Sequence, residues 1–271
     1  MTIAMESSQR KDVWAAGALY EPYVGRWSRR VAGEFLQWLS IPDAHNWLDV
    51  GCGTGALTQT VLDRAAPASI RGIDPSDAFI GYAAAHVLDP RASFAVGDAR
   101  ALPVETASCN AVVSGLVLNF VPEPQRAVSE MIRVVRPGGD IAVYVWDYAG
   151  KMELMRYFWD AAVAEDAHAL DLDEGRRFPL CQPGPLAELF AGTGLMDVTT
   201  TAIEVPTPFR DFDDYWTPFL SGQGPAPGYA MSLSPERRDT LRESLRAALP
   251  VAADGSIPLV ARAWAVRGRS P

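Results

Sequence analysis

The sequence has few of the residues that metal sites and disulfide frameworks need. It contains only three cysteines, Cys52, Cys109 and Cys181, and no two of them have the CxxC spacing of a zinc or redox motif. An odd number of isolated cysteines does not suggest a disulfide framework, so we expect three free thiols. HExxH, the EF-hand loop, G-x-S-x-G and the P-loop are also missing. These absences exclude the commonest metal-dependent, esterase and phosphoryl-transfer sites, and we expect no bound metal.

Long basic runs and long apolar runs are missing as well. The net charge is −9, and no run of Lys and Arg is long enough to neutralise phosphates along a duplex, so nucleic acid is not an expected partner. No stretch is long enough to span a bilayer, and the start of the chain lacks the apolar region of a signal peptide. We therefore expect a cytoplasmic protein, monomer or homodimer, without membrane contact. A hydrophobic fraction of 48% over 271 residues suits one large α/β domain.

One short stretch combines an apolar strand, a single acid and three alternating glycines. It is WLDVGCGTG, residues 47–55, and a segment with helical spacing of apolar residues follows it. Glycines here allow positive φ and leave no Cβ between backbone and ligand, so strand, turn and helix N-terminus form a nucleotide-type cradle. The G-x-G-x-x-A pattern of Gly51, Gly53 and Ala56 also suits a dinucleotide. Asp49 would repel a pyrophosphate, however, and therefore favours a cationic ligand.

The order acid-x-Gly-x-Gly-x-Gly resembles the first motif of class I S-adenosylmethionine-dependent methyltransferases. Their cofactor, S-adenosyl-L-methionine (SAM), carries a sulfonium, an ammonium and only one carboxylate. The resemblance implies an α/β, Rossmann-like methyltransferase fold, with a central, mostly parallel seven-stranded sheet, an antiparallel last strand and helices on both faces. It also implies that residues of this turn bind the cofactor: Asp49, Gly51, Cys52, Gly53 and Gly55.

Two further acids each follow a predicted strand, where ligands of a parallel sheet bind. Asp74 ends SIRGID, roughly twenty residues beyond the glycines, where a carboxylate can accept both ribose hydroxyls. Asp98 follows a short predicted strand over residues 94–96. It resembles the family acid that accepts from the adenine amino group, with the amide of Ala99 facing the ring. We expect Asp74, the adjacent Pro75, Asp98 and Ala99 to bind the cofactor.

The segment 109–147 resembles the fourth and fifth strands of the same fold, including an RVxRPGG connection. By this resemblance the backbone of Gly115 and Leu116 runs beside the methionine part of the cofactor. Relatives often have His in the loop that follows, whereas this chain has Asn119. A role of that imidazole therefore does not carry over to this protein.

The N-terminal region resembles the opening Y-x-x-x-x-G-R-W-S of a bacterial methyltransferase subgroup. By this resemblance Tyr20 and Arg26 hold the methionine carboxylate, although Arg26 also suits a surface ion pair. Ser28 is predicted to cap a helix over residues 29–40 that packs against the sheet. This helix would precede the first strand and close over the cofactor.

Local patterns also predict element boundaries elsewhere. Ser76 and Ser234 are predicted helix N-caps. The helix before the RPGG connection is predicted to continue through Arg136. The last two strands are predicted at about residues 198–205 and 259–266.

We expect one domain over residues 1–271, organised in three consecutive regions. A helical cap over 1–45 precedes a cofactor-binding core over 46–150, and 151–271 supplies acceptor-side helices and closing strands. Aromatic and acidic residues over 209–219, before a Gly/Pro-rich stretch, predict a mobile wall over an apolar acceptor pocket. A packed loop and a dimer contact are the alternatives.

These motifs predict an enzyme that transfers a methyl group from SAM to a small-molecule acceptor by in-line displacement. Such a reaction needs alignment and exclusion of water, and a general base is optional. No catalytic residue is assigned: His168 and the acids of 211–214 are candidates, whereas His45 and His86 are expected at the surface. Two alternatives stay open, an NAD(P)-binding oxidoreductase and a regulatory protein that binds the cofactor without turnover.

Overall fold

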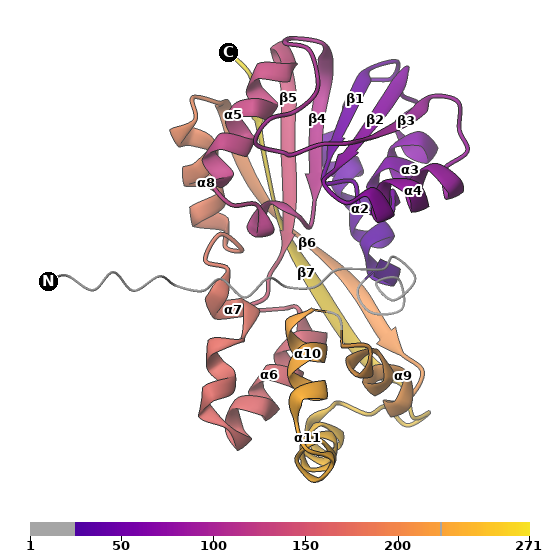
Figure 1. Cartoon of the computed structure of the whole chain (residues 1–271), viewed down its shortest axis with the longest axis vertical. Helices are drawn as coiled ribbons and strands as arrows, with labels where there is room; N and C mark the ends of the chain where they lie inside the picture. Colours follow the sequence, from indigo (N-terminus) through magenta and orange to yellow (C-terminus); the bar gives the residue numbers. More distant parts are fainter. Residues whose placement is uncertain (1–24, 223) are drawn as a thin grey trace, which may run out of the picture.

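The computed structural model describes residues 25–222 and 224–271. One seven-stranded sheet runs through it in the order β3-β2-β1-β4-β5-β7-β6 (Figure 1). β7 is antiparallel to both of its neighbours, whereas the other pairs are parallel, which confirms the predicted fold. The strands are β1 (Asn46–Val50), β2 (Ser69–Asp74), β3 (Ala92–Val96), β4 (Cys109–Gly115), β5 (Val135–Trp146), β6 (Met196–Phe209) and β7 (Ile257–Arg269).

Helices cover both faces of this sheet. On one face lie α2 (Arg26–Leu39), α3 (Ala56–Arg64) and α4 (Asp77–His86), and on the other lie α5 (Pro124–Val134) and α8 (Pro183–Gly192) (Figure 1). A strand covered on both faces reads as a continuous apolar run, and Ala111, Val112 and Val113 of β4 are fully buried. The short helix η2 (Leu118–Phe120) follows β4 at the carboxyl edge.

Two of the three predicted helix caps are confirmed. The hydroxyl of Ser76 accepts from the amide of Phe79 at 3.3 Å, and the hydroxyl of Ser234 accepts from that of Arg237 at 3.3 Å. The cap at Ser28 is wrong. α2 begins before it, so the Ser28 hydroxyl lies in the first turn and donates back to the carbonyl of Gly25 instead of accepting from an amide.

The predicted bounds of three elements were wrong because sheet pairing decides them. α5 ends at Val134, since Val135 already pairs with Cys109 in the sheet. β6 and β7 are longer than predicted, because they pair with each other from Met196 and Arg269 to Phe209 and Ile257. The last residue of β5, Trp146, pairs with Ala263. Beyond that point β6 and β7 form a two-stranded extension of the sheet.

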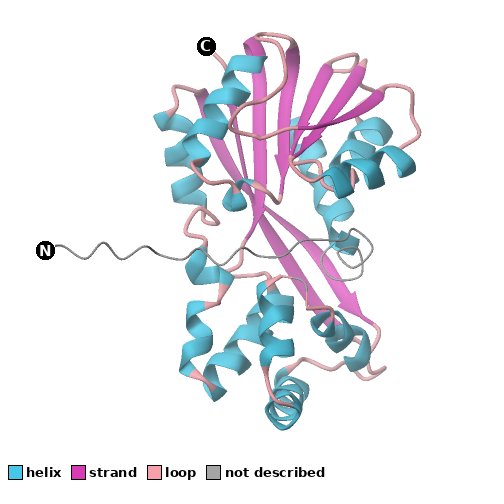
Figure 2. Cartoon of the chain, in the orientation of Figure 1, coloured by secondary structure: helices cyan, strands magenta, loops and turns pink. Residues whose placement is uncertain are grey.

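Helices gather around this extension and form what we call the helical lobe, residues 153–177 and 212–248 (Figure 2). Both of its parts are insertions, one between β5 and β6 and one between β6 and β7. It consists of α6 (Glu153–Glu165), η3 (Ala167–Asp171), α7 (Glu174–Arg177), α9 (Phe212–Trp216), η4 (Thr217–Leu220), α10 (Pro225–Ser232) and α11 (Pro235–Ala248).

The aromatic residues of 209–219 form the core of the helical lobe. Phe219 stacks on Phe158 of α6 at 4.5 Å between ring centroids, and the Tyr215 hydroxyl donates to the carbonyl of Leu154 at 3.0 Å. All five rings of the segment are buried: Phe209, Phe212, Tyr215, Trp216 and Phe219. The segment is therefore packed. The prediction of a mobile wall was wrong for these rings, and so was that of an exposed dimer contact.

The sequence predicts three free thiols and no membrane-spanning stretch. Cys52, Cys109 and Cys181 are all buried free thiols, as predicted. In 25–222 and 224–271, every helix is too short or too polar to cross a membrane.

Candidate functional site

Each of the three glycines in the turn after β1 has a positive φ, at 75° for Gly51, 52° for Gly53 and 87° for Gly55. A Cβ added to Gly51 would lie 2.5 Å from Val117 in the loop after β4, so the close approach of the two loops requires glycine there. A Cβ added to Gly53 would meet none of the described residues within 4 Å. The backbone at Gly53 therefore borders open space, as a ligand cradle requires.

Cys52 contributes its backbone to this turn. Its amide donates to the carbonyl of Ile73 at 3.1 Å, and the amide of Gly51 donates to the same oxygen at 2.7 Å, which ties the turn to β2. The side chain is buried, and burial, with smaller contributions from Asp49 and Asp74, raises the pKa of the thiol. Cys52 is therefore a neutral thiol rather than a nucleophilic thiolate.

Asp49 lies at the centre of the cradle and is 0% exposed. Its Oδ2 accepts from the hydroxyl of Thr58 on α3 at 2.7 Å, whereas its Oδ1 has no hydrogen-bond partner in 25–222 and 224–271. Burial raises the pKa of Asp49 to about 7, the bond from Thr58 lowers it, and the nearby Asp74 raises it further. A buried acid with an unpaired oxygen suits a cationic ligand, as the sequence predicted.

Asp74 joins the end of β2 to the glycine turn. Its Oδ2 accepts from the amide of Gly53 at 3.0 Å, and its Oδ1 accepts from the amide of Ser76 at 2.9 Å. The residue is 7% exposed, and burial raises its pKa against these two hydrogen bonds. Each oxygen keeps a further lone pair, so Asp74 can also accept from a ligand hydroxyl. The adjacent Pro75 is exposed.

Asp98 and Ala99 lie at the same edge, one strand further out. The amide of Gly97 donates to the carbonyl of Asp74 at 3.1 Å, which brings the two predicted acids together. The Asp98 side chain is 46% exposed and pairs with the guanidinium of Arg100 at 2.7 Å, which lowers the pKa of Asp98. An adenine amino group at Asp98 would therefore share this carboxylate with Arg100.

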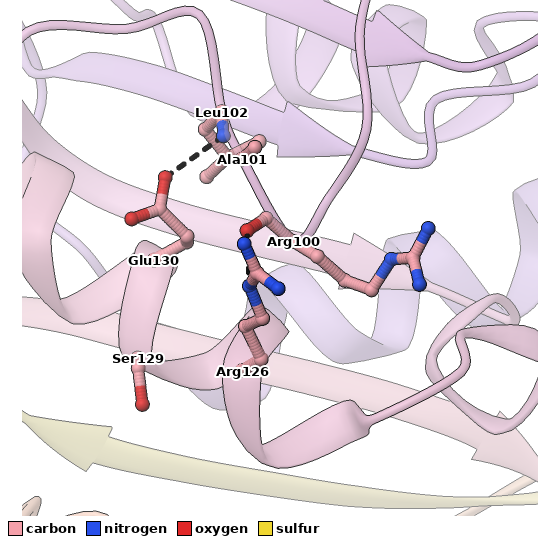
Figure 3. Close-up of a pocket in the computed structure, with 6 residues that line it drawn as sticks. All are labelled: Arg100, Ala101, Leu102, Arg126, Ser129 and Glu130. Atoms are coloured by element: carbon pink, nitrogen blue, oxygen red, sulfur yellow. Dashed lines mark hydrogen bonds between the residues drawn. The ribbon is translucent and has the colours of Figure 1, made fainter.

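A hollow of about 310 Å³ lies next to this loop, on the outer surface of the protein (Figure 3). Its polar groups are already engaged, because Arg126 Nε donates to the carbonyl of Arg100 at 3.1 Å and Glu130 accepts from the amide of Leu102 at 2.8 Å. Figure 3 shows the side chain of Arg100 directed away from Glu130. None of the predicted site residues lines this hollow.

Gly115 and Leu116 lie where β4 ends and turns toward the cradle. Leu116 has φ of 62°, and its amide donates to the carbonyl of Tyr144 on β5 at 2.7 Å. A Cβ on Gly115 would overlap the hydroxyl of Tyr144. The next residue in this loop, Val117, has its side chain against Gly51. The loop after β4 therefore lies directly against the glycine turn.

Some predicted residues are not part of this arrangement. Tyr20 and the side chain of Arg26 lie outside the described residues. His168 is exposed on η3, and His86 is exposed and stacks on the ring of Tyr82. His45 is half-buried just before β1. Within the described ranges, no group of His, Cys, Asp and Glu side chains could hold a metal ion.

Sequence reasoning missed the buried charges near the helical lobe. Glu174 is fully buried, accepts from the indole of Trp159, and has its pKa raised to about 8 by burial. Asp147 after β5 pairs with Arg262 of β7 at 2.6 Å. No local pattern marks these residues, because the partners are 15 and 115 positions apart.

Comparison with known proteins agrees with this geometry. Residues 48–143 match the model of the family described as "Methyltransferase domain". This segment runs from within β1 to within β5 and contains all of the predicted cradle residues from Asp49 onward. The resemblance to class I SAM-dependent methyltransferases is therefore confirmed over residues 48–143.

Individual relatives of the chain are also named as methyltransferases. The chain is 36% identical to malonyl-[acyl-carrier protein] O-methyltransferase of Hahella chejuensis over 46% of this chain and 44% of that protein. It is 30% identical to trans-aconitate 2-methyltransferase of Deinococcus radiodurans over 59% of this chain and 61% of that protein. The matches span roughly half the length of such curated relatives.

Among solved structures, phosphoethanolamine N-methyltransferase 2 of Haemonchus contortus in complex with SAM has the same fold. Its TM-score is 0.57 at 15% sequence identity, covering 93% of this chain and 56% of that chain. At this identity the likeness concerns the fold alone.

Proposed function

We propose that this protein binds SAM at the glycine turn and transfers its methyl group to a small-molecule acceptor. One observation carries the proposal: the glycine turn combines open space at Gly53 with a buried acid that has an unpaired oxygen, Asp49, and a second acid, Asp74, that accepts from the Gly53 amide. A sulfonium and an ammonium suit the first acid, and ribose hydroxyls suit the second. The diphosphate of NAD would be repelled by both acids, which disfavours an oxidoreductase.

The residues present fit the parts of SAM in order along the carboxyl edge. Asp49 would face the cationic methionine end, beside the backbone of Gly115 and Leu116. Asp74 would accept from the ribose, and Asp98 would accept from the adenine amino group. Val117, the residue before η2, lies against Gly51 of the glycine turn. The two relatives named above act, by their names, on an acyl-carrier-bound malonyl group and on trans-aconitate, which supports a small-molecule acceptor.

When bound, SAM supplies a methyl group activated by the sulfonium. The protein's own residues need only orient the acceptor in line and keep water out. Val117 borders the glycine turn from the side of β4. No described histidine lies at this edge, so a general base is not part of the proposal.

Calorimetry with SAM, NAD and NADP tests the binding step. We expect SAM to bind and neither nicotinamide cofactor to bind. Tight binding of NAD or NADP without binding of SAM would overturn the proposal. Release of S-adenosylhomocysteine in the presence of an acceptor separates an enzyme from a regulatory protein that binds SAM without turnover.

A further inference from the structure

Asn119 is the one asparagine of the chain whose amide has no partner among the described residues. The sequence contains three asparagines. The side-chain oxygen of Asn46 accepts from the hydroxyl of Ser69 at 2.9 Å. The side-chain oxygen of Asn110 accepts from the backbone N–H of Asn46 at 3.0 Å. Both Oδ1 and Nδ2 of Asn119 are buried and make no hydrogen bond. Leaving a buried polar group unpaired costs about 1–3 kcal/mol, so this amide requires an explanation.

Asn119 lies beside the proposed cofactor cradle. It is the middle residue of η2, and this helix begins directly after Val117, the residue whose side chain lies against Gly51. The turn is fixed by the amide of Phe120, which donates to the carbonyl of Val117 at 2.8 Å. The unpaired amide is therefore held two positions from the contact between the loop and the glycine turn.

Aromatic rings pack against Phe120, the residue that follows Asn119. Phe120 makes an edge contact with Phe178 at 4.9 Å between ring centroids, and Phe178 lies 5.9 Å from the ring of Tyr148. Phe178 directly follows α7 of the helical lobe, and Tyr148 follows the carboxyl end of β5. The rings thus join the loop after β4 to the insertion. They supply an apolar, aromatic wall next to a polar group that lacks a partner.

We propose that Asn119 is a specificity-determining residue that binds the methyl acceptor through both atoms of its amide. Nδ2 can only donate and Oδ1 can only accept, so the acceptor must carry a group that does both. A hydroxyl or an amine meets this requirement. A carboxylate would accept from Nδ2 and leave Oδ1 unpaired. The acceptor class is therefore an aromatic or otherwise apolar small molecule with an O–H or N–H group, and this inference rests on the proposed methyl transfer.

A binding experiment with the S-adenosylhomocysteine-loaded protein tests the acceptor class. The probes are phenol, aniline and benzoate, which share one ring and differ in the polar group, and their binding is followed by ligand-observed NMR at about pH 7.5. We expect phenol and aniline to bind and benzoate to bind at least tenfold more weakly. Preference for benzoate, or no binding of phenol and aniline, would overturn the inference.

Variants connect this selectivity to Asn119. Asn119→Leu should weaken phenol binding at least tenfold and leave the affinity for S-adenosylhomocysteine unchanged. It should also raise the melting temperature of the ligand-free protein by about 2–4 °C, because a similar volume is kept and an unpaired buried amide is removed. Asn119→Ala should show the same loss of phenol binding.

Asn110→Leu is the matched control, since its amide is paired and lies at the opposite end of β4. It should lower the melting temperature and keep phenol binding. If Asn119→Leu binds phenol as the wild type does, Asn119 does not hold the acceptor. If the wild type fails to bind S-adenosylhomocysteine at all, the proposed function itself fails, which is a different result.

Discussion

The buried acid at the glycine turn predicts that cofactor binding depends on pH. Without ligand, burial raises the pKa of Asp49 to about 7, so near neutral pH a large fraction of the protein carries a proton there. A cationic ligand beside the unpaired Oδ1 favours the ionised carboxylate and lowers that pKa. Binding should therefore release a proton, and the apparent affinity should rise with pH until Asp49 is fully ionised.

The expected size of this effect follows from the pKa. At pH 6 about ten in eleven molecules carry the proton on Asp49, whereas at pH 7.5 about one in four does. If the bound form is fully ionised, the dissociation constant of SAM falls roughly eightfold over this interval. Asp49→Asn cannot ionise and should bind SAM more weakly with no such change.

Calorimetry measures both the number of protons released on binding and the affinity for SAM. Titrations of SAM in buffers of different ionisation enthalpy report the number of protons released, and the series between pH 6 and 7.5 reports the affinity. The ammonium of SAM itself titrates at about pH 8, so each value is compared with Asp49→Asn at the same pH. If the affinity of the wild type for SAM does not change between pH 6 and 7.5, or changes equally in Asp49→Asn, no cation binds at Asp49.

Four further variants test the site and the fold. Asp74→Ala should weaken SAM binding by about 1.5–3 kcal/mol in calorimetry while the domain stays folded, and an unchanged affinity would reject the ribose role. Gly53→Val should abolish SAM binding, because the side chain enters the cradle and a β-branched residue disfavours positive φ; normal binding would place the ligand elsewhere. Glu174 has a folded pKa of about 8 against 4.5 in its unfolded reference, so the folded state holds the extra proton and stability falls as pH rises through this window. Urea unfolding should show a loss of about 1.4 kcal/mol per pH unit in the wild type relative to Glu174→Gln, and equal slopes would mean that Glu174 is ionised in the fold. Trp216→Ala should cost about 3–5 kcal/mol of stability, since the ring is buried in the helical lobe, and leave SAM affinity unchanged; a fully stable variant with reduced turnover would restore a lid role.

Features carried by neighbouring residues were predictable from the sequence. The turn from Asp49 to Gly55 follows from local chemistry, because alternating glycines after an apolar strand allow the positive φ that the turn needs. The cap at Ser76 is equally local, since a hydroxyl and an amide three residues on suffice for it. The mostly parallel seven-stranded sheet with an antiparallel last strand followed from the family resemblance, and the structure confirms it.

Features that need partners distant in the chain were decided only by the tertiary structure. The rings of 209–219 form the same sequence pattern whether they cover a ligand or fill a core, and packing against Phe158 of α6 made them core. Glu174 reads as an ordinary surface acid until Trp159 and burial are known. The unpaired amide of Asn119 is also a tertiary property, because a missing hydrogen bond is visible only when all of its neighbours are in place. Sequence periodicity reports which residues prefer burial, and the three-dimensional packing decides what buries them.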